Sequence, residues 1–454
     1  MAVISLTNII EISNQKRIDS EFFHTKYIQA ESAVRKCNTK SLGILGDFII
    51  GPFGSAFHVN NYDPKSKFRY IRGKDVKPFQ LLDDDNVYMP EKDFLRLKRY
   101  AVKANDVIIS VVGTLGNVAV IPENEEGIFS CKSTIFRDSL VDPYYLLVYL
   151  NSSYGKECLL RRQRGAIQAG LNKEDLKTIP IPIFSEEIHK KLADKIRLSI
   201  ELSKQSKSLY QQATQLLEQE LGLDKLKFKK EKSFRASFSE VIKEHRINAE
   251  FFYPHLKLIS GHSQLHDSAP LITFFKVIRG ATPKGYCTKG IKVIKTKNIR
   301  TPQIDIDRIL DYVDSSKNLI SLKENDLLLA SMGVGSLGRM SFIDKIDDEY
   351  IVDGTIRILR KKNSIPVNYE IPTLLFLSSE IGQRLIYRGI VGSTGIISLP
   401  DEYLKKLPIP LFSEKLRNNL TVLVKESIRC KNESRQFLEQ AKSEVETLIE
   451  QATN

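Results

Sequence analysis

Several features that would define a function class are missing from this 454-residue sequence. Its five cysteines are an odd number and contain no C-x-x-C spacing, which argues against a disulfide framework and against a structural zinc site. No run of about 18 apolar residues is present, so we expect no membrane-spanning helix and no membrane partner. The first residues lack the basic stretch and long apolar core of a secretion signal, and we therefore expect a cytoplasmic protein.

The composition is that of an ordinary globular chain with an excess of positive charge. Hydrophobic residues make up 42% and charged residues 27%, which excludes a disordered protein. At roughly 150 residues per domain, the length corresponds to about three units. Sixty-eight basic residues against 55 acidic ones give a net charge of +13, which favours a polyanionic partner such as nucleic acid.

The second half of the sequence repeats segments of the first half, at an offset close to half its length. This duplication is its most informative feature. Blocks of the first half return in the second half in the same order. The matching blocks are R-I-D-S-E-F-F at 17–23 and R-I-N-A-E-F-F at 246–252, K-A-N-D-V-I-I at 103–109 and K-E-N-D-L-L-L at 323–329, G-T-L-G at 113–116 and G-S-L-G at 335–338, and L-K-T-I-P-I-P-I-F-S-E at 176–186 and L-K-K-L-P-I-P-L-F-S-E at 404–414.

The blocks predict a tandem pseudo-repeat. We expect two globular α+β parts at residues 1–185 and 246–413, in which short β-like runs alternate with fewer helices. We expect long helices at 186–222 and 414–454, and a basic connector at 223–245. The helical segments are close to neutral, so the positive excess lies in the globular parts and the connector.

Each half ends in a long helix with a single apolar stripe. Ser185 and Ser413 are suitable N-caps, and each is followed by glutamate in the first helical turn. The stripe residues match at a constant offset of 228 residues: Leu192, Ile196, Ile200, Leu209, Ala213 and Leu217 with Leu420, Val424, Ile428, Phe437, Ala441 and Val445. The two stripes could pack against each other as an antiparallel coiled coil, or each helix could lie on its own globular part; the pattern favours the coiled coil.

The signatures of large nucleic-acid enzymes are absent together. The G-x-G-x-x-G segment at 333–338 is followed by a strand-like run and is better interpreted as a hairpin turn than as a dinucleotide site. The glycines of segment 280–285 have the spacing of a phosphate-binding loop, but Tyr286 and Cys287 stand where lysine and serine or threonine are required. No H-E-x-x-H pattern, nucleophile elbow or Asn-Pro-Pro-aromatic segment is present. We therefore predict a non-catalytic chain that holds neither a metal nor a cofactor.

Three kinds of segment in each half are candidates for contact with DNA. Residues 64–74 and 268–304 are rich in lysine and arginine and contain no acidic residue, so their cations could contact phosphates. Glycine-containing turns could bring Arg, Gln, Ser and Thr side chains to base edges. So could the loop that precedes the long helix of each half, at residues 161–170 and 384–395. The candidate residues are Ser55, Lys67, Arg69, Arg72, Lys74, Arg161, Arg162, Arg164, Gln168, Arg279, Thr282, Lys284, Lys292, Lys295, Lys297, Arg300, Arg384, Arg388, Ser393 and Thr394.

Taken in order, these motifs resemble the specificity subunits of type I restriction-modification systems. The resemblance covers the whole chain and rests on the tandem halves, the opening R-I-D-S-E-F-F, the G-P-F-G-S turn at 51–55, the K-A-N-D-V-I-I segment, and the I-P-I-P segment that runs into a long helix.

The resemblance implies that each globular part is a target-recognition domain for one half of a split double-stranded DNA site, with the paired helices as a spacer. It further implies docking of two methyltransferase subunits, which would bind S-adenosylmethionine, and of ATP-dependent restriction subunits outside them. A recognition subunit of a related bifunctional restriction-methylation system, a stand-alone DNA methyltransferase and a transcriptional repressor remain as alternatives.

Overall fold

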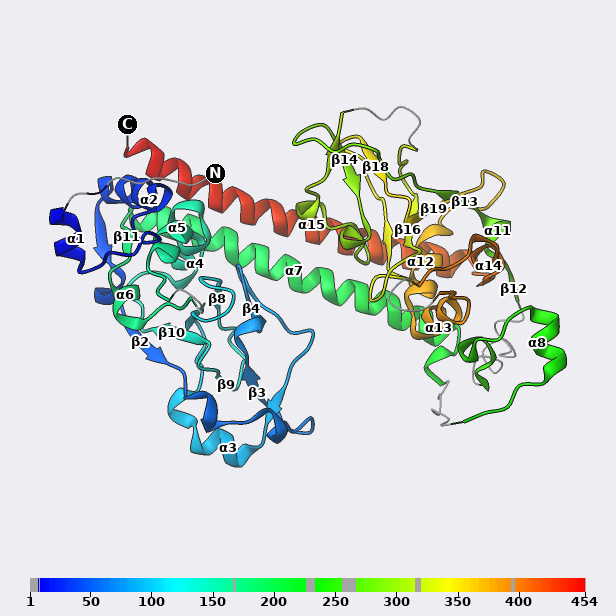
Figure 1. Cartoon of the computed structure of the whole chain (residues 1–454), viewed down its shortest axis with the longest axis horizontal. Helices are drawn as coiled ribbons and strands as arrows, with labels where there is room; N and C mark the ends of the chain where they lie inside the picture. The colour runs from blue at the N-terminus through cyan, green and yellow to red at the C-terminus, as the bar shows by residue number, and fades with distance from the viewer. Residues whose placement is uncertain are drawn as a thin grey trace. The chain divides into compact units, whose positions relative to one another are not determined.

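The computed structural model describes residues 7, 9–165, 169–225, 233–254, 267–314, 320–392 and 397–453 (Figure 1). The chain forms two compact units. The first contains residues 1–202 and 433–454, and the second contains residues 203–432. Both units mix helices and strands, and within the described ranges no helix is long and apolar enough to cross a membrane.

The first unit is built on a four-stranded antiparallel sheet in the order β2-β10-β7-β8. A three-stranded sheet has the order β6-β3-β9, with β3 and β9 parallel, and two strand pairs complete the unit. The strands are β1 Thr39–Ser41, β2 Asp47–Ile50, β3 Phe68–Ile71, β4 Val76–Lys77, β5 Gln80–Leu81, β6 Tyr88–Met89, β7 Val107–Ser110, β8 Val118–Val120, β9 Gly127–Phe129, β10 Ser133–Arg137 and β11 Pro180–Pro182.

Helices of the first unit precede and follow these sheets. The α-helices are α1 Ile9–Gln15, α2 Thr25–Lys36, α3 Glu91–Arg96, α4 Pro143–Asn151, α5 Ser153–Arg161 and α6 Lys173–Lys177. The long α7 Glu186–Glu220 follows, and its residues from 203 onward belong to the second unit. Short 3-10 turns are η1 Leu42–Ile44, η2 Gly54–Ala56, η3 Val59–Asn61, η4 Gly73–Asp75 and η5 Lys98–Tyr100.

The second unit contains sheets of the same sizes with the same strand directions. Its four-stranded sheet has the order β13-β19-β16-β17 and its three-stranded sheet the order β15-β14-β18, with β14 and β18 parallel. The strands are β12 Ser268–Pro270, β13 Phe275–Arg279, β14 Ile291–Ile294, β15 Tyr312–Val313, β16 Leu327–Ala330, β17 Met340–Phe342, β18 Tyr350–Val352, β19 Ile356–Lys361 and β20 Pro408–Pro410. The glycine-rich segment 333–338 connects antiparallel β16 and β17 and is therefore a hairpin turn.

The helices of the second unit follow a similar order along the chain. They are α8 Phe238–Glu244, α11 Leu271–Phe274, α12 Glu370–Ser378, α13 Glu380–Arg388 and α14 Asp401–Lys405. The long α15 Glu414–Gln451 begins in this unit, and its residues from 433 onward belong to the first unit. The 3-10 turns are η6 Leu223–Lys225, η7 Ala249–Phe252, η8 Thr296–Asn298 and η9 Ile306–Arg308.

The repeated N-D segments have the same role in both units. Asn105 and Asn325 adopt left-handed backbone conformations with φ of 67° and 66°, which asparagine tolerates better than most residues. The buried aspartate that follows each of them accepts a hydrogen bond from the backbone N–H three residues earlier. It also pairs with an arginine of an inner strand of the four-stranded sheet, Asp106 with Arg137 of β10 and Asp326 with Arg360 of β19. This clasp fixes the entry into β7 and β16.

The two long helices begin as the sequence predicts. Ser185 Oγ accepts a hydrogen bond from Ile188 N–H at 3.4 Å, and Ser413 Oγ accepts one from Leu416 N–H at 3.3 Å, so both serines are N-caps. After α7, Gly222 has a φ of 59°, the left-handed conformation common just beyond helix ends.

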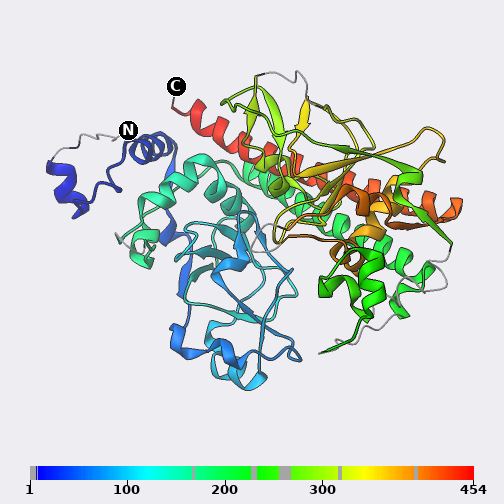
Figure 2. The same ribbon diagram turned by 45° about the vertical axis from the view of Figure 1, so that its right-hand side comes forward.

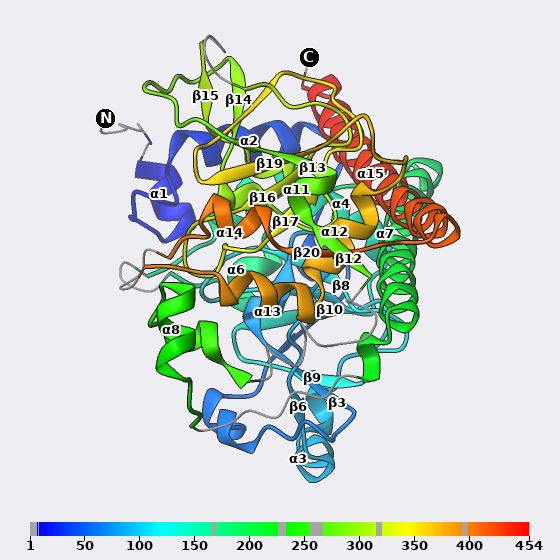
Figure 3. The same cartoon turned by 90° about the vertical axis from the view of Figure 1, so that its right-hand side faces the viewer.

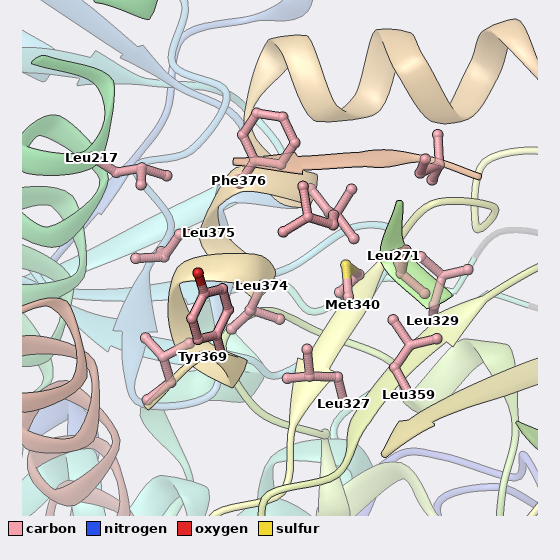
Figure 4. Packing of buried hydrophobic residues seen from close by; sticks show 14 of the residues in the cluster. Leu217, Leu271, Leu327, Leu329, Met340, Leu359, Tyr369, Leu374, Leu375 and Phe376 are labelled. Carbon is pink, nitrogen blue, oxygen red and sulfur yellow. The ribbon is translucent and has the colours of Figure 1, made fainter. Parts of the chain in front are cut away.

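Each unit has a core that includes segments of both long helices. In the first unit, Leu192 and Ile196 of α7 are buried together with Ala441 and Val445 of α15. In the second unit, Ala213 and Leu217 of α7 join Leu420, Val424 and Ile428 of α15. Figure 4 shows Leu217 pointing toward Leu375 and Phe376 of α12. The stripe residues Ile200, Leu209 and Phe437 are half-buried.

Within each unit, α7 and α15 lie side by side, as Figures 2 and 3 show from two further directions. In the first unit Lys191 and Lys195 pair with Glu444, and Ser199 bonds to Ser434. In the second unit Ser206 bonds to Ser427. Since the residue number rises along α7 as that of its partner falls along α15, the helix segments run antiparallel.

Candidate nucleic-acid interface

The candidate DNA-binding turns of the first unit gather at one edge of its sheets. Strands β2 and β7 end where β10 and β8 begin, because neighbouring strands are antiparallel. The parallel strands β3 and β9 end together, and Ile71 O accepts a hydrogen bond from Ser130 N–H at 2.9 Å. We call the resulting set of loops the first edge; it comprises residues 51–56, 72–75, 111–117 and 130–132.

The second unit presents an equivalent set of loops. Strands β13 and β16 end where β19 and β17 begin, and β14 and β18 end side by side. We call this set the second edge; it comprises residues 279–284, 295–298, 331–338 and 353–355. Thr282 Oγ1 accepts a hydrogen bond from Gly354 N–H at 3.3 Å, which ties two of these loops together.

In each unit, the loop that precedes the long helix of that half is connected to the first or second edge by backbone bridges. Gly170 pairs with both Val112 and Arg164 in the first unit, and Ser398 pairs with Met332 and Val391 in the second. The candidate residues Gln168, Ser393 and Thr394 belong to these loops but lie outside the described residues.

Side chains of α5 and α13 fasten the glycine turns of the two edges. Lys156 donates hydrogen bonds to Leu115 O at 3.0 Å and Gly116 O at 2.5 Å, and burial lowers the pKa of this lysine. At the matching position, Gln383 donates to Gly338 O at 2.9 Å. The helices α5 and α13 thus fix the backbone of these turns, while Thr114 and Val334 in the turns remain exposed.

On the first edge, the turn residue Ser55 is exposed, and Arg72 and Lys74 are held by carboxylates. Arg72 is half-buried and pairs with Asp75 at 2.9 Å, while the exposed Lys74 pairs with Asp85 at 2.7 Å. An exposed ion pair contributes little stability, so Lys74 can exchange Asp85 for a phosphate at small cost.

Two of the strand candidates lie away from the first edge. Lys67 precedes β3, where it is exposed and pairs with Glu126 at 2.9 Å. Arg69 is 4% exposed and pairs with Glu125 at 3.0 Å. Since β3 is buried along its whole length, Arg69 does not face outward, contrary to the prediction that the cations of segment 64–74 contact phosphates.

Arg161 and Arg162 lie inside the first unit, and this corrects the prediction that they face DNA. They are 6% and 3% exposed, and both pair with Glu31 of α2. Burial alone would raise the pKa of Glu31, but hydrogen bonding and charge from Arg162, with Arg161 and Arg35, lower it to about 2. Removing the arginines would leave a buried carboxylate with only the exposed Arg35 as a partner, which is strongly unfavourable. Their guanidinium groups are therefore required by the fold.

Arg164, by contrast, is exposed beside the first edge. It donates two hydrogen bonds to Asp175, at 2.5 Å and 2.8 Å. This ion pair would have to break for the guanidinium to turn toward DNA. Since the arginine is exposed, we retain it as a candidate contact.

On the second edge, Arg279, Thr282 and Lys284 are exposed. The cations of the β14 region are held by carboxylates: Lys292 pairs with Asp348 at 2.8 Å, and Lys295 and Lys297 pair with Asp311 at 2.7 Å and 2.8 Å.

The arginines of α13 have structural contacts. Arg388 donates to Phe251 O at 2.9 Å and its guanidinium lies 4.5 Å from the centre of the Phe251 ring. Arg384 donates to Glu380 at 2.9 Å on the same helix. Arg388 therefore fixes the repeated opening motif of the second half, rather than pointing to a ligand as we predicted.

Two exposed side chains on the first edge were not among the predicted residues. Phe53, between Pro52 and Gly54, is 86% exposed. Lys132 is exposed in the turn between β9 and β10, against Gly73. The sequence did hold a signal for Phe53, since an aromatic residue between proline and glycine in a turn cannot enter a core strand. The sequence held no such signal for Lys132, because the position of Lys132 next to Gly73 depends on the pairing of β3 with β9.

The exposed side chains of these edges can contact phosphates and base edges. They present hydroxyl, ammonium and guanidinium groups and one aromatic ring. Among the residues that the structure describes, no group of three or more His, Cys, Asp or Glu side chains is arranged to hold a metal ion.

No family model and no curated protein matches the sequence. Among solved structures, the S subunit of a type I restriction-modification system from M. genitalium is 15% identical and has a TM-score of 0.48, covering 91% of this chain and 95% of that chain. The HsdS subunit from Thermoanaerobacter tengcongensis is 14% identical with a TM-score of 0.29, covering 92% and 96%.

A chain from a structure described for complex assembly and conformational transition of the type I R-M system is 14% identical with a TM-score of 0.30, covering 92% of this chain and 97% of that chain. Two of these three neighbours are described as type I S subunits, and both extend over more than nine tenths of this chain. They are of the family that the sequence motifs resemble.

Proposed function

We propose that this chain is the specificity subunit of a type I restriction-modification complex and that it reads a bipartite site on double-stranded DNA. The observation that carries the proposal is the recurrence of one loop edge in both units. The framework that holds each edge is repeated, including the Asp–Arg clasps, whereas the exposed side chains of the two edges differ. Two half-sites of different sequence follow from this difference.

We propose that residues 1–185 and 246–413 are the two target-recognition domains, that residues 186–222 and 414–454 form an antiparallel coiled coil between them, and that residues 223–245 connect the halves. The serine pairs and the Lys–Glu contacts between α7 and α15 support the helix pairing. A helix of about 36 residues spans roughly 54 Å, and successive major grooves lie about 34 Å apart. A helix spacer of this length can therefore separate two readers by at least one turn of DNA.

The partners in this proposal are two methyltransferase subunits, which would bind S-adenosylmethionine, and restriction subunits that cleave DNA. The chain itself has no catalytic role, and such a complex would act in the cytoplasm. The duplication supports two copies of one partner, because the opening motif presents the same surface twice. Ile18 and Ile247 are 87% and 89% exposed at matching positions of this motif.

The proposal is tested by sequencing methylated DNA from cells that express the methyltransferase subunit with this chain. We expect methylated adenines within a two-part motif of fixed spacing, and none without this chain. A variant of the first edge should alter one half of the motif, and a variant of the second edge the other half. A continuous motif, or methylation that does not depend on this chain, would contradict the proposal. Methyl transfer by the purified chain alone would instead identify a stand-alone methyltransferase.

A further inference from the structure

A group of arginines lies in the second unit where the second edge approaches α15. The segment after η8 runs along the outer strand β17: Arg300 N–H donates to Ser341 Oγ at 3.0 Å, and Phe342 N–H donates to Pro302 O at 2.7 Å. This pairing brings Arg300 next to Arg339, which directly precedes β17. Arg308 ends η9 in the same segment. We call Arg300, Arg308 and Arg339 the arginine cluster.

The charges of the cluster are poorly compensated. Burial lowers the pKa of Arg300, and the nearby charges of Arg339 and Arg308 lower it further. Arg308 pairs with Asp305 at 3.1 Å. Among the described residues, no carboxylate lies within 4.0 Å of the guanidinium groups of Arg300 or Arg339. Three like charges held together in this way create a positive potential that favours an anionic ligand.

The positive region continues onto the helix pair of the second unit. Gln303 donates to Asn432 of α15 at 2.9 Å, which docks the cluster segment on that helix. Lys431 lies near Lys207 of α7 and near Asp305 and Asp307. Together, these named residues are five cations and two carboxylates, an excess of three positive charges.

The repeated fold does not require this cluster. At the position that matches Arg339, the first unit has Asn117, which is buried and donates to Val76 O at 3.1 Å. At the position that matches Arg300 it has the half-buried Lys77. Because the first unit folds in the same way without the arginines, their concentration in the second unit points to a ligand that only this unit contacts at that place.

We propose that the arginine cluster binds backbone phosphates of DNA next to the half-site that the second edge reads, on the side of α15. This inference rests on the proposed DNA-reading function. Duplex DNA carries one negative charge per roughly 1.7 Å of its axis, and guanidinium groups match phosphate oxygens in geometry. The cluster segment is held by backbone hydrogen bonds to β17, so its arginines are positioned before DNA arrives. They would contribute affinity and orientation, and no base specificity.

The test is the salt dependence of DNA binding by the complete chain, assembled with its methyltransferase subunits. The variant changes Arg300→Gln, Arg308→Gln and Arg339→Gln together. Its binding to a duplex that carries the two-part motif is measured by fluorescence anisotropy at several salt concentrations. If all three arginines contact phosphates, the slope of log affinity against log salt falls by up to about 2.7. Affinity falls to a similar extent for every sequence flanking the half-site, and the methylated motif is unchanged.

A matched control removes three positive charges from the opposite end of the same sheet. Lys276, Lys323 and Lys345 are exposed near the far ends of β13, β16 and β17, and their joint change to glutamine should leave the slope nearly unchanged. Arg→Lys changes at the three cluster positions should retain most of the slope, since the charges remain. Thermal unfolding of the cluster variant should match that of the wild type, because its substitutions remove repulsion and no ion pair to a buried carboxylate.

An unchanged slope in the cluster variant, or an equal loss in the control, would overturn the inference while the proposed function stands. If the wild-type complex itself shows no preference for a two-part motif, the proposed function fails instead.

Discussion

Ser199 of α7 and Ser434 of α15 exchange hydrogen bonds across the helix pair of the first unit. The hydroxyl of Ser199 donates to Ser434 O at 2.7 Å, and the hydroxyl of Ser434 donates to Ser199 O at 2.6 Å. In the second unit, Ser427 donates to Ser206 O at 2.7 Å. An offset of 228 residues relates Ser199 to Ser427 and Ser206 to Ser434, so the duplication relates the two contacts to each other. A side chain that reaches the carbonyl of the facing helix requires the two backbones to approach closely.

The close approach predicts that Ser434 tolerates loss of its hydroxyl better than gain of volume. We expect Ser434→Ala to cost about 1 kcal/mol, the worth of a typical hydrogen bond. Ser434→Leu should cost a further 1–3 kcal/mol or so, because the helices would have to separate. Thermal and denaturant unfolding measure both. Ser443→Leu, at an exposed position of the same helix, is the control and should change stability by less than about 0.5 kcal/mol. Equal effects at positions 434 and 443 would exclude the close approach.

The buried ion cluster around Glu31 predicts a pH-dependent contribution to stability. The pKa of Glu31 falls from an ordinary value of 4.5 to about 2 in the folded protein. A folded pKa below the unfolded one means that the contribution is present above pH 4.5 and is lost as the pH falls toward 2. Glu31→Gln should therefore cost about 3–5 kcal/mol at pH 7, since two buried arginines lose their carboxylate. Near pH 2 the variant and the wild type should converge.

Denaturant unfolding at a series of pH values measures this difference. The control is Glu174→Gln, which removes an exposed ion pair with Lys177 in the same unit and should cost no more than about 1 kcal/mol at any pH. A gap between Glu31→Gln and the wild type that stays constant from pH 7 to pH 2 would show that the ion cluster is not its source.

The sequence predicted well those features that depend on neighbours along the chain. The N-caps Ser185 and Ser413, the hairpin turn at 333–338 and the long helices follow from local patterns, and hydrogen bonds in the structure confirm the caps. The function of Arg161 and Arg162 could not be predicted in this way. Their partner Glu31 lies 131 residues from Arg162 along the chain, and a basic run at a helix end looks the same in sequence whether it faces a buried carboxylate or water.

The packing of the long helices illustrates a second limit of sequence patterns. The apolar stripes show that one face of each helix is buried, but they do not name what covers it. In the structure, the same stripe contacts both the other helix and a globular core. The serine pairs could not be predicted in this way either. Serines do recur at the 228-residue offset, but isolated serines carry no hydrophobic signal.

The left-handed turn at Asn325 predicts a narrow range of tolerated residues. Its φ of 66° suits asparagine and glycine, whereas a β-branched side chain would meet a steric penalty of about 1–2 kcal/mol. We expect Asn325→Gly to be nearly neutral and Asn325→Val to be destabilising by about that amount, as measured by thermal unfolding. The corresponding variants of Asn105, with a φ of 67°, should behave in the same way. A well-tolerated valine at both positions would show that the clasp does not depend on this backbone conformation.

Phe53 provides the sharpest test of the first edge. The side chain is 86% exposed, so Phe53→Ala should leave the unfolding temperature nearly unchanged. On DNA, an apolar side chain can contact a thymine methyl group, and the loss of one preferred base pair of a specific site typically costs about 1–3 kcal/mol. We expect Phe53→Ala to weaken binding to the two-part motif by about tenfold and to relax the methylated motif at one or two base pairs of a single half-site.

The matched control for Phe53 is Leu140→Ala, which also shortens an exposed apolar side chain of the first unit. Leu140 is 75% exposed and follows the far end of β10, away from the first edge. Its truncation should change neither affinity nor motif. Because both residues are exposed in the free chain, a difference between the two variants reports contact with DNA and not folding. If Phe53→Ala leaves the motif and the affinity as they are, the turn at 51–56 does not read DNA.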